Sequence, residues 1–246
     1  FEQETLPERG AVIGLGVIGL ELGQALARLG VDVTGITLDK AYGHISDPQL
    51  QDYMHEVVRE EMKVHLSPVE ALDENDDGLV VTLKDGTSVT VDAALVTMGR
   101  RPNIGDLGLR EVLGLGEREM PEFSTNTFRI KDTPIYFAGD VNGSRPLLHE
   151  AADEGRIAGH NAVREEDDCF RRRTPLTVAF SSPIIGLVGE SHRALVEREE
   201  DFVIGEVSYE GQGRAIVKLK ERGLLRVYVQ RQSGRMQVVL HIANRG

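Results

Sequence analysis

Three glycines, Gly14, Gly16 and Gly19, have the G-x-G-x-x-G spacing of a loop that binds the diphosphate of a dinucleotide. An apolar run at 11–13 precedes them, and a segment with helical periodicity follows them. In such a strand–turn–helix unit the first glycine permits the tight turn, the second lets the backbone approach the diphosphate, and the third lets helix and strand pack closely. The bound anion then meets unpaired N–H groups at the positive end of the helix dipole. This stretch predicts a dinucleotide site, with a glycine-rich turn of some other α/β protein as the alternative.

The helix after the glycines is expected to bury one apolar stripe against the strand. The residues of that stripe are Leu20, Ala25, Leu26 and Leu29. Gly30 suits the position just after the helix, where a left-handed backbone is common. Residues 31–38 then form a second strand, so that a compact βαβ unit is expected over 11–38.

The end of this second strand bears on the choice of cofactor. A carboxylate there commonly accepts hydrogen bonds from the ribose hydroxyls of NAD. Thr37 stands at the expected position, and Asp39 lies two residues further on. Lys40 is the only basic residue nearby, and no arginine is available to hold the 2′-phosphate of NADP. We therefore expect NAD rather than NADP, with Thr37 able to accept one hydroxyl.

A second helix is expected to run to about residue 63. Two N-caps compete for its start, Ser46 in a capping box with Gln49 and Asp47 ahead of Pro48. After it, short apolar runs predict strands at 64–66, 69–72, 79–83, 88–91 and 93–98. Asp85 and the glycine after it form a strong hairpin signal, so the middle strands read as a β-meander that covers one face of a parallel sheet.

Beyond residue 98 the pattern changes. Two interpretations are open for Gly99 and the two arginines that follow it. They form either a basic surface turn or a place where the backbone approaches the nucleotide. Irregular structure is expected at 104–134, a strand at 134–140, a helix at 147–163 and a charged linker at 165–173. Further strands at 176–180, 202–209, 215–220, 224–230 and 237–242, with a helix at 192–199, predict an antiparallel α+β unit.

The composition excludes several classes of protein. A formal net charge of −12 over 246 residues argues against nucleic acid and anionic membrane surfaces as main partners. No apolar run is long enough to span a membrane, and no signal peptide pattern precedes the first strand, so a cytoplasmic location is expected. Cys169 is the only cysteine, which excludes an internal disulfide and a multi-cysteine metal site. No metal ligand set is expected.

Several motifs occur together in one order. They are VIGLGVIGLELG at 12–23, GRRPN at 99–103, IYFAGDV at 135–141, LLHEAADEG at 147–155 and PIIGLVG at 183–189. In these the chain resembles the flavin-dependent pyridine nucleotide–disulfide oxidoreductases, and within them the dihydrolipoamide dehydrogenases. The resemblance covers nearly the whole chain and weakens after about residue 234.

The resemblance implies an α/β fold with three parts. These are a Rossmann-type NAD-binding domain with an inserted β-meander (9–100), a flavin-side segment that belongs to an FAD domain (101–169), and an α+β dimerisation domain (174–246). It assigns NAD contacts to Gly14, Leu15, Gly16, Val17, Ile18, Gly19, Leu20, Glu21, Thr37, Val69 and Gly99. Glu21 would line the nicotinamide side, and Thr37 replaces the usual ribose-binding glutamate. It assigns FAD contacts to Asp140, Pro146, Leu147, Leu148 and His149.

The family also uses parts that are not found among these residues. They are an N-terminal FAD domain with its own glycine motif, a C-x-x-x-x-C redox disulfide and a C-terminal acid–base histidine. The sequence is therefore interpreted as an internal piece of a homodimeric enzyme that carries electrons from a lipoyl-type dithiol through FAD to NAD. No catalytic residue is assigned within it, the chain is expected to be inactive alone, and 101–169 is expected to expose apolar surface.

Two other readings stay open. One is a different flavoenzyme of the same build, such as an NADH oxidase, a mercuric reductase or a soluble transhydrogenase. The other is a non-catalytic NAD-binding or redox-sensing module.

Overall fold

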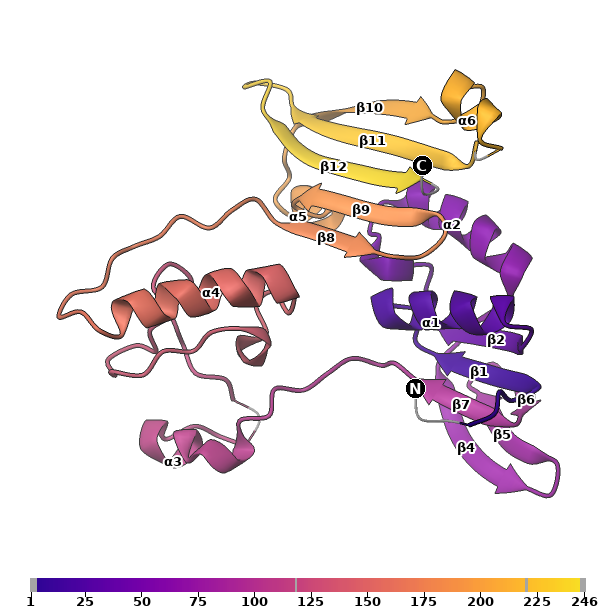
Figure 1. Ribbon diagram of the computed structural model, residues 1–246, viewed down its shortest axis with the longest axis horizontal. Coiled ribbons are helices and arrows are strands. Elements are labelled where there is room, and N and C mark those ends of the chain that lie inside the picture. Colours follow the sequence, from indigo (N-terminus) through magenta and orange to yellow (C-terminus); the bar gives the residue numbers. More distant parts are fainter. Residues whose placement is uncertain (1–3, 118, 220, 244–246) are drawn as a thin grey trace. The chain divides into compact units, whose positions relative to one another are not determined.

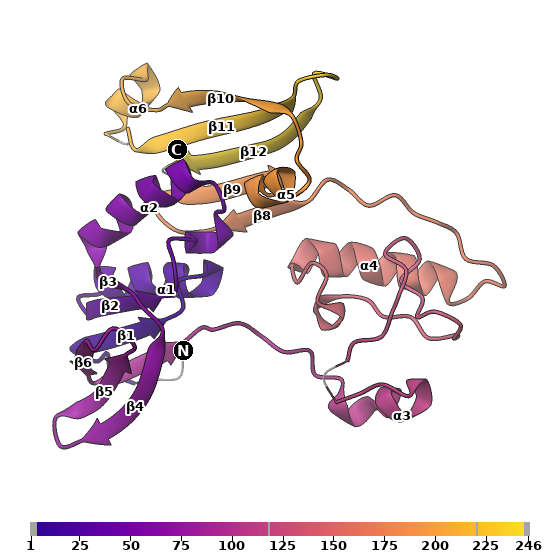
Figure 2. The same ribbon diagram turned by 180° about the vertical axis from the view of Figure 1, so that it is seen from behind.

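The computed structural model describes residues 4–117, 119–219 and 221–243 (Figure 1). The chain forms two compact units. Unit 1 combines the residues up to Met98 with those from Pro175 onward, and unit 2 consists of Gly99–Thr174. Within unit 1 the elements are layered in the order five-stranded sheet, helices α1 and α2, parallel sheet and meander (Figures 1 and 2). No helix among the described residues is long and apolar enough to cross a membrane.

A four-stranded parallel sheet forms the centre of the nucleotide half of unit 1. Its strands, in spatial order, are β3 (Lys63–Leu66), β2 (Asp32–Thr37), β1 (Arg9–Ile13) and β7 (Ala93–Val96). Helix α1 (Val17–Arg28) connects β1 to β2. Its C-cap is Leu29, and Gly30 follows with φ of +98°. The predicted βαβ unit is confirmed, including the left-handed glycine after the helix.

The buried stripe of α1 differs from the predicted one. Leu20, Gly23 and Gln24 are buried, whereas Ala25 is exposed and Leu29 is 65% exposed. The polar Gln24 belongs to the stripe because both ends of its amide bond the backbone of Ser182, each at 2.8 Å. Periodicity favoured the apolar residues and missed this amide, whose partner comes from a distant part of the chain.

Helix α2 (Pro48–Glu61) settles the choice between the two N-caps. The Asp47 carboxylate accepts a hydrogen bond from the amide of Leu50 at 3.1 Å, so Asp47 is the cap. The hydroxyl of Ser46 instead accepts from the amide of Arg193 at 3.1 Å. The helix ends at Glu61, slightly earlier than predicted, because Met62 is already extended and leads into β3.

The predicted meander is confirmed as a three-stranded antiparallel sheet. It comprises β4 (Val69–Asn75), β5 (Gly78–Leu83) and β6 (Ser88–Val91). One buried cluster joins Ala11, Ile13 and Ile36 of the parallel sheet to Val81, Leu83 and Val91 of the meander. The meander therefore covers one face of the parallel sheet, as expected.

A five-stranded antiparallel sheet occupies the other half of unit 1. Its strands, in spatial order, are β10 (Phe202–Ser208), β11 (Gly223–Gln230), β12 (Met236–Ala243), β9 (Ile184–Gly189) and β8 (Leu176–Ala179). Helix α5 (His192–Glu197) lies between β9 and β10 in sequence. The α+β prediction is confirmed, but β9 had not been predicted as a strand, because two glycines interrupt its apolar pattern.

The strand predicted at 215–220 is wrong. Residues 215–217 lie in helix α6 (Gly213–Val217), residues 218 and 219 form a turn, and residue 220 lies outside the described residues. The side chain of Gln212 accepts a hydrogen bond from the amide of Ala215 at 2.8 Å and so caps this helix. The β-branched residues Ile216 and Val217 favour a strand by propensity, and the cap overrides that weak preference.

The two halves of unit 1 share one core. Buried residues of the nucleotide half, among them Leu15, Leu20 and Met54, belong to the same cluster as Ile185 and Tyr228 of the five-stranded sheet. The division of this unit into separate NAD-binding and dimerisation domains stays a prediction.

Unit 2 contains helices α3 (Leu109–Leu113) and α4 (Leu148–Asn161), and the short turns η2 (Gly105–Leu107) and η3 (Asp140–Asn142). The helix predicted at 147–163 is confirmed as α4. The strand predicted at 134–140 is wrong, since this segment makes only an isolated bridge between Arg129 and Tyr136. Its backbone pairs instead with the loop just before it, as in the hydrogen bond from Phe137 N to Phe128 O at 2.7 Å. In the described part of unit 2 no multi-stranded sheet offers it a longer edge.

The charged segment 165–173, predicted as a linker, connects α4 to β8 in sequence and is held by partners on α4. The side chain of Asn161 donates to the carbonyl of Asp168 at 3.1 Å and accepts from its amide at 3.0 Å. Arg172 is paired with Glu150, and its side chain is 11% exposed. Charged residues that fit a solvated linker by composition are here fixed by partners on α4.

Unit 2 exposes apolar side chains, as expected for 101–169. They are Leu107, Val112, Met120, Leu148 and Val163, of which Leu148 is 88% exposed. Such a set of exposed apolar residues is typical of a surface that another part of a protein covers.

Candidate functional site

The glycine turn joins β1 to α1 at the carboxyl end of the parallel sheet. Gly14 has φ of +96°, and its amide donates to the carbonyl of Ile36 at 2.7 Å. A Cβ at this position would lie 2.8 Å from the carbonyl oxygen of Thr97. Both the conformation and the space at Gly14 therefore require glycine.

Gly19 brings helix α1 into direct contact with this turn. A Cβ on Gly19 would lie 1.8 Å from the carbonyl oxygen of Gly14 and 2.5 Å from the hydroxyl of Thr97. The Thr97 hydroxyl itself donates to the Gly14 carbonyl at 2.6 Å. Thr97 therefore fixes the turn, a contribution that the sequence analysis missed because Thr97 follows a strand far along the chain.

Gly16 differs from the other two glycines because it has room beside it. It is the N-cap of α1, with φ of −65°, and no side chain caps the helix in the described structure. The nearest atoms to a Cβ on Gly16 would be those of the His44 ring, at 3.6 and 3.7 Å. Neither fold nor conformation requires glycine here, but open space beside uncapped N–H groups fits a diphosphate.

The remaining residues of the motif have mixed surroundings. Leu15 and Leu20 are buried in the core, which leaves only their backbone to face a ligand. Val17 is half-buried and Ile18 is exposed at the start of α1. The carboxylate of Glu21, predicted to line the nicotinamide side, accepts from the amide of Phe180 at 2.6 Å.

The segment that follows β2, residues 37–47, carries one lysine and no arginine. Thr37 is half-buried as the last residue of β2, and Asp39 accepts from the amide of Ala41 at 2.8 Å. Lys40 forms an ion pair with Asp52 at 2.7 Å. This pairing keeps the one lysine of the segment from serving a 2′-phosphate unless the pair opens. Val69, predicted to lie beside an adenine, is half-buried as the first residue of β4.

The residues predicted to contact a flavin lie in unit 2. Asp140 is exposed at the start of η3, and a nitrogen of Arg100 lies 3.0 Å from its carboxylate. Arg100 also donates to the carbonyl of Pro146 at 3.3 Å, so one guanidinium joins two of the predicted contacts. Gly99 opens this unit with φ of +98°.

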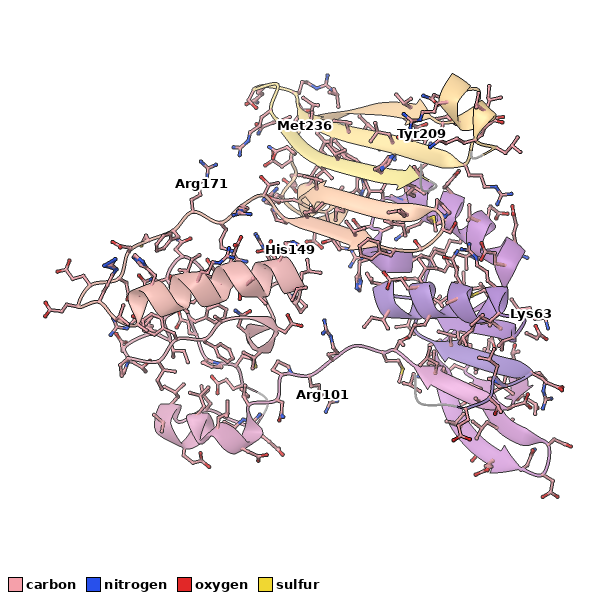
Figure 3. All side chains as sticks on the ribbon, in the orientation of Figure 1. Lys63, Arg101, His149, Arg171, Tyr209 and Met236 are labelled. Atoms are coloured by element: carbon pink, nitrogen blue, oxygen red, sulfur yellow. The ribbon has the colours of Figure 1, made fainter. Side chains whose placement is uncertain are left out.

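The N-terminus of α4 follows directly. Its N-cap, Leu147, is extended, and the described structure shows no side-chain cap there. Leu148 and His149 are exposed in the first turn, and Figure 3 shows His149 at the end of the helix. An uncapped N-terminus of a 14-residue helix favours negative charge nearby, which suits the pyrimidine side of a reduced flavin.

A buried carboxylate that the sequence analysis did not assign holds the Asp140 turn in place. Glu154 is fully buried on α4. Its carboxylate accepts from the amide of Gly139 at 2.7 Å and from the side chain of Asn142 at 2.6 Å. Arg172 completes the arrangement with an ion pair to Glu154 at 2.8 Å.

Glu150, one turn before Glu154, belongs to the same network. It pairs with Arg172 and, at 3.3 Å, with Arg145. Burial alone would raise the pKa of the Glu150 carboxyl, but the hydrogen bond from Arg172 and the charge of Arg145 hold that pKa below its usual range. Glu150 is therefore an anion in the folded protein, and two acids on α4 share the charge of Arg172.

Comparison with known proteins decides the family. Residues 1–155, well over half of the chain, match the model of the pyridine nucleotide-disulphide oxidoreductases. The chain belongs to this family. The similarity inferred from the motifs is thereby confirmed.

The relatives of this oxidoreductase chain include dihydrolipoyl dehydrogenases. That of Haloferax volcanii is 32% identical over 248 residues, which are 95% of this chain and 50% of that protein. The mitochondrial dihydrolipoyl dehydrogenase of Sus scrofa is 29% identical over 247 residues, 95% of this chain and 47% of that protein. The chain spans about half the length of the curated relatives it matches.

Solved structures share the fold of this chain. LpdA from Mycobacterium tuberculosis superposes with a TM-score of 0.83 at 28% identity, covering 98% of this chain and 53% of LpdA. The flavoprotein disulfide reductase RclA from Escherichia coli reaches a TM-score of 0.84 at 22% identity, covering 99% of this chain and 56% of RclA. The second likeness concerns the fold alone. The predicted fold class, α/β with parallel and antiparallel sheets, is confirmed.

The predicted contact residues fall into two groups along the division of the chain into units. The NAD group lies in unit 1, except for Gly99, and the flavin group lies in unit 2. Glu154 was overlooked although it stands inside the LLHEAADEG motif. Its four-residue spacing from Glu150 places two acids on one helix face, which is the signal that could have revealed a buried pair.

Proposed function

We propose that this chain supplies the NAD-binding and dimerisation portion of a dihydrolipoamide dehydrogenase-like flavoenzyme. In such an enzyme electrons pass from a lipoyl-type dithiol through a redox disulfide and FAD to NAD. The observation that carries the proposal is the glycine turn. Packing demands glycine at Gly14 and Gly19, whereas only an approaching ligand would demand it at Gly16.

In this proposal the turn holds the cofactor through backbone groups. The N–H groups at the start of α1 donate to the diphosphate, and Thr97 keeps the turn rigid by bonding the Gly14 carbonyl. The hydroxyl of Thr37 accepts a hydrogen bond from a ribose hydroxyl, at the position where a carboxylate is usual. The ion pair of Lys40 with Asp52 supports NAD over NADP, because a 2′-phosphate lacks a free cation on this segment.

Unit 2 would present the flavin with an acid and a helix end. FAD, when bound, would supply the two-electron redox chemistry that links the dithiol form of the disulfide to NAD. Asp140 would accept from the ribityl hydroxyls, and the residues from Pro146 to His149 would face the ring. The network of Glu154 positions the Asp140 turn, and the α4 N-terminus stabilises the negative charge that builds up on reduction.

The other parts of the proposed reaction need residues from elsewhere in the enzyme. Cys169 is the only cysteine of these 246 residues, so the redox disulfide would come from other residues, as would the acid–base histidine. The five-stranded sheet would form part of a homodimer interface. Mercuric reductases, NADH oxidases and transhydrogenases of the same build are distinguished by those other residues.

Binding of NADH to the purified chain tests the proposal, with fluorescence of NADH as the readout. Gly16→Ala should weaken the binding of NADH at least tenfold. It should leave the fold intact, because the new Cβ meets nothing closer than 3.6 Å. Gly105→Ala serves as the control, since a Cβ there is also unobstructed and Gly105 belongs to unit 2, whereas the turn belongs to unit 1. Equal NADH affinity of the chain and of Gly16→Ala would overturn the proposal.

A further inference from the structure

His44 lies beside the glycine turn and has a strained backbone. It ends the 3-10 turn η1 (Tyr42–His44) with φ of +69°, a region that residues other than glycine seldom adopt, although asparagine, aspartate and histidine are enriched there. Its ring atoms Cε1 and Nε2 lie 3.6 and 3.7 Å from the position of a Cβ on Gly16. The imidazole thus stands over the N-cap of α1, at the place where Gly16 leaves room for a ligand.

The turn that carries His44 is fixed from two sides. The amide of Gly43 donates to the carbonyl of Leu15, within the glycine motif, at 3.3 Å. On the other side Gly43 approaches the five-stranded sheet so closely that a Cβ would lie 2.9 Å from Ile185. The buried hydroxyl of Tyr42 bonds the ring of His55 at 2.6 Å. The left-handed conformation of His44 is therefore held by its surroundings.

The imidazole of His44 is exposed and makes no hydrogen bond to any described residue. The segment 37–47 contains one lysine and no arginine, and that lysine is paired with Asp52. The ring of His44 is thus the polar group that this segment places against Gly16. It stands where a donor could reach a ligand that the uncapped helix N-terminus also binds.

We propose that His44 is a dinucleotide-binding residue, whose Nε2–H donates a hydrogen bond to a diphosphate oxygen of NAD held at Gly16. The inference rests on the proposed function, because it needs a dinucleotide in this turn. It names a side chain that adds to the backbone N–H groups of α1. It also supplies a polar contact on a segment where Thr37 replaces a carboxylate and so offers fewer hydrogen bonds to the ribose.

Three variants test the role of His44 in the purified chain. His44→Gly removes the ring and suits the left-handed backbone, so the fold is kept. His44→Gln keeps an N–H donor of similar reach. Glu199→Gly is the matched control, because Glu199 is another exposed residue of unit 1 with a left-handed backbone, at φ of +53°. The probes are NADH, NADPH, ADP-ribose and adenosine, with unfolding by urea as the check on stability.

We expect His44→Gly to weaken the binding of NADH and of ADP-ribose about tenfold, which corresponds to ~1.4 kcal/mol of binding free energy. The affinity for NADPH should fall by the same factor. The affinity for adenosine, which has no phosphate, should not change. His44→Gln should recover part of the loss, and Glu199→Gly should match the original chain. The partial rescue by a donor of different shape separates a hydrogen bond from mere packing.

Several results would overturn this inference while leaving the proposed function intact. They are unchanged NADH affinity in His44→Gly, tighter binding in that variant, which would make the ring an obstacle, and a loss confined to NADPH, which would place the contact at the 2′-phosphate. Failure of the original chain to bind NADH would instead count against the proposed function, and this inference would fall with it.

Discussion

The carboxylate of Glu154 accepts a hydrogen bond from the backbone amide of Gly139 at 2.7 Å, and this bond joins helix α4 to the turn that starts at Asp140. Asn142, at the other end of that turn, donates to the same carboxylate oxygen at 2.6 Å. Asp140 itself is exposed between these two anchored residues. An acid in the core of unit 2 thus fixes the backbone around an acid on its surface, so the position of Asp140 depends on Glu154.

Removing the charge of Glu154 should therefore loosen this turn. Glu154→Gln leaves Arg172 partly buried without one of its two acids, and breaking a buried pair costs on the order of 3 kcal/mol. We expect a lower urea midpoint and faster hydrogen exchange at 139–144. Glu165→Gln, a change at an exposed residue, is the control. Unchanged exchange in Glu154→Gln would show that the buried carboxylate does not hold the turn.

The contact of Gly19 with Gly14 leads to a second prediction. In Gly19→Ala the new Cβ would begin 1.8 Å from the Gly14 carbonyl oxygen, so α1 must move away from the turn. Such overpacking costs about 1–3 kcal/mol or more, whereas Gly16→Ala changes only an N-cap and should cost less than about 1 kcal/mol. Urea unfolding of the two variants measures the difference. Equal stabilities would mean that helix and turn are not packed as closely as described.

Local signals predicted much of this fold. The spacing of Gly14, Gly16 and Gly19 was sufficient for the βαβ unit, and Gly30 marked the end of its helix, because turns and caps depend on a few neighbouring residues. The predicted buried stripe of α1 was wrong at Gln24, because the amide of this residue bonds the backbone of Ser182, far along the chain. A hydrogen bond between distant segments leaves no periodic trace in the sequence.

The site shows the same division. The motif residues of both units could be named in advance, but the partners of Thr97, Glu154 and Arg172 could not. Each of them acts on a segment that is remote in sequence, as when Arg172, in a run that read as a linker, pairs with Glu154. Composition makes charged residues exposed by default, and only the three-dimensional structure shows which of them are buried with partners.

Two histidines, the buried His55 and the half-buried His241, predict how stability changes with pH. The pKa of His55 is lowered mainly by burial. Burial also lowers the pKa of His241. A histidine whose pKa falls on folding binds more protons when unfolded, so stability is full above about pH 6.5, the unfolded value, and declines as the pH falls below it. Each histidine changes the free energy of unfolding by at most about 1.4 kcal/mol per pH unit.

Urea midpoints measured from pH 7.5 down to about 5 check this sign. The double variant His55→Gln with His241→Gln should be less stable at neutral pH, because Tyr42 and Tyr209 each lose a ring partner. Its stability should nevertheless depend less on pH over this window. A slope as steep as that of the original chain would show that other groups govern the acid sensitivity.

Cys169 limits what the chain can do with a dithiol. Oxidising a dithiol to a disulfide releases two electrons and two protons, and in the proposed enzyme a second disulfide accepts them by thiol–disulfide exchange. One cysteine among 246 residues cannot form that acceptor within the chain. We therefore expect the purified chain, given dihydrolipoamide and NAD, to produce no NADH above a Cys169→Ser control, although it binds NADH. A dihydrolipoyl dehydrogenase assayed in parallel establishes that the substrates are competent. NADH formed in proportion to the concentration of the chain, and lost in Cys169→Ser, would contradict this expectation and assign Cys169 a redox role.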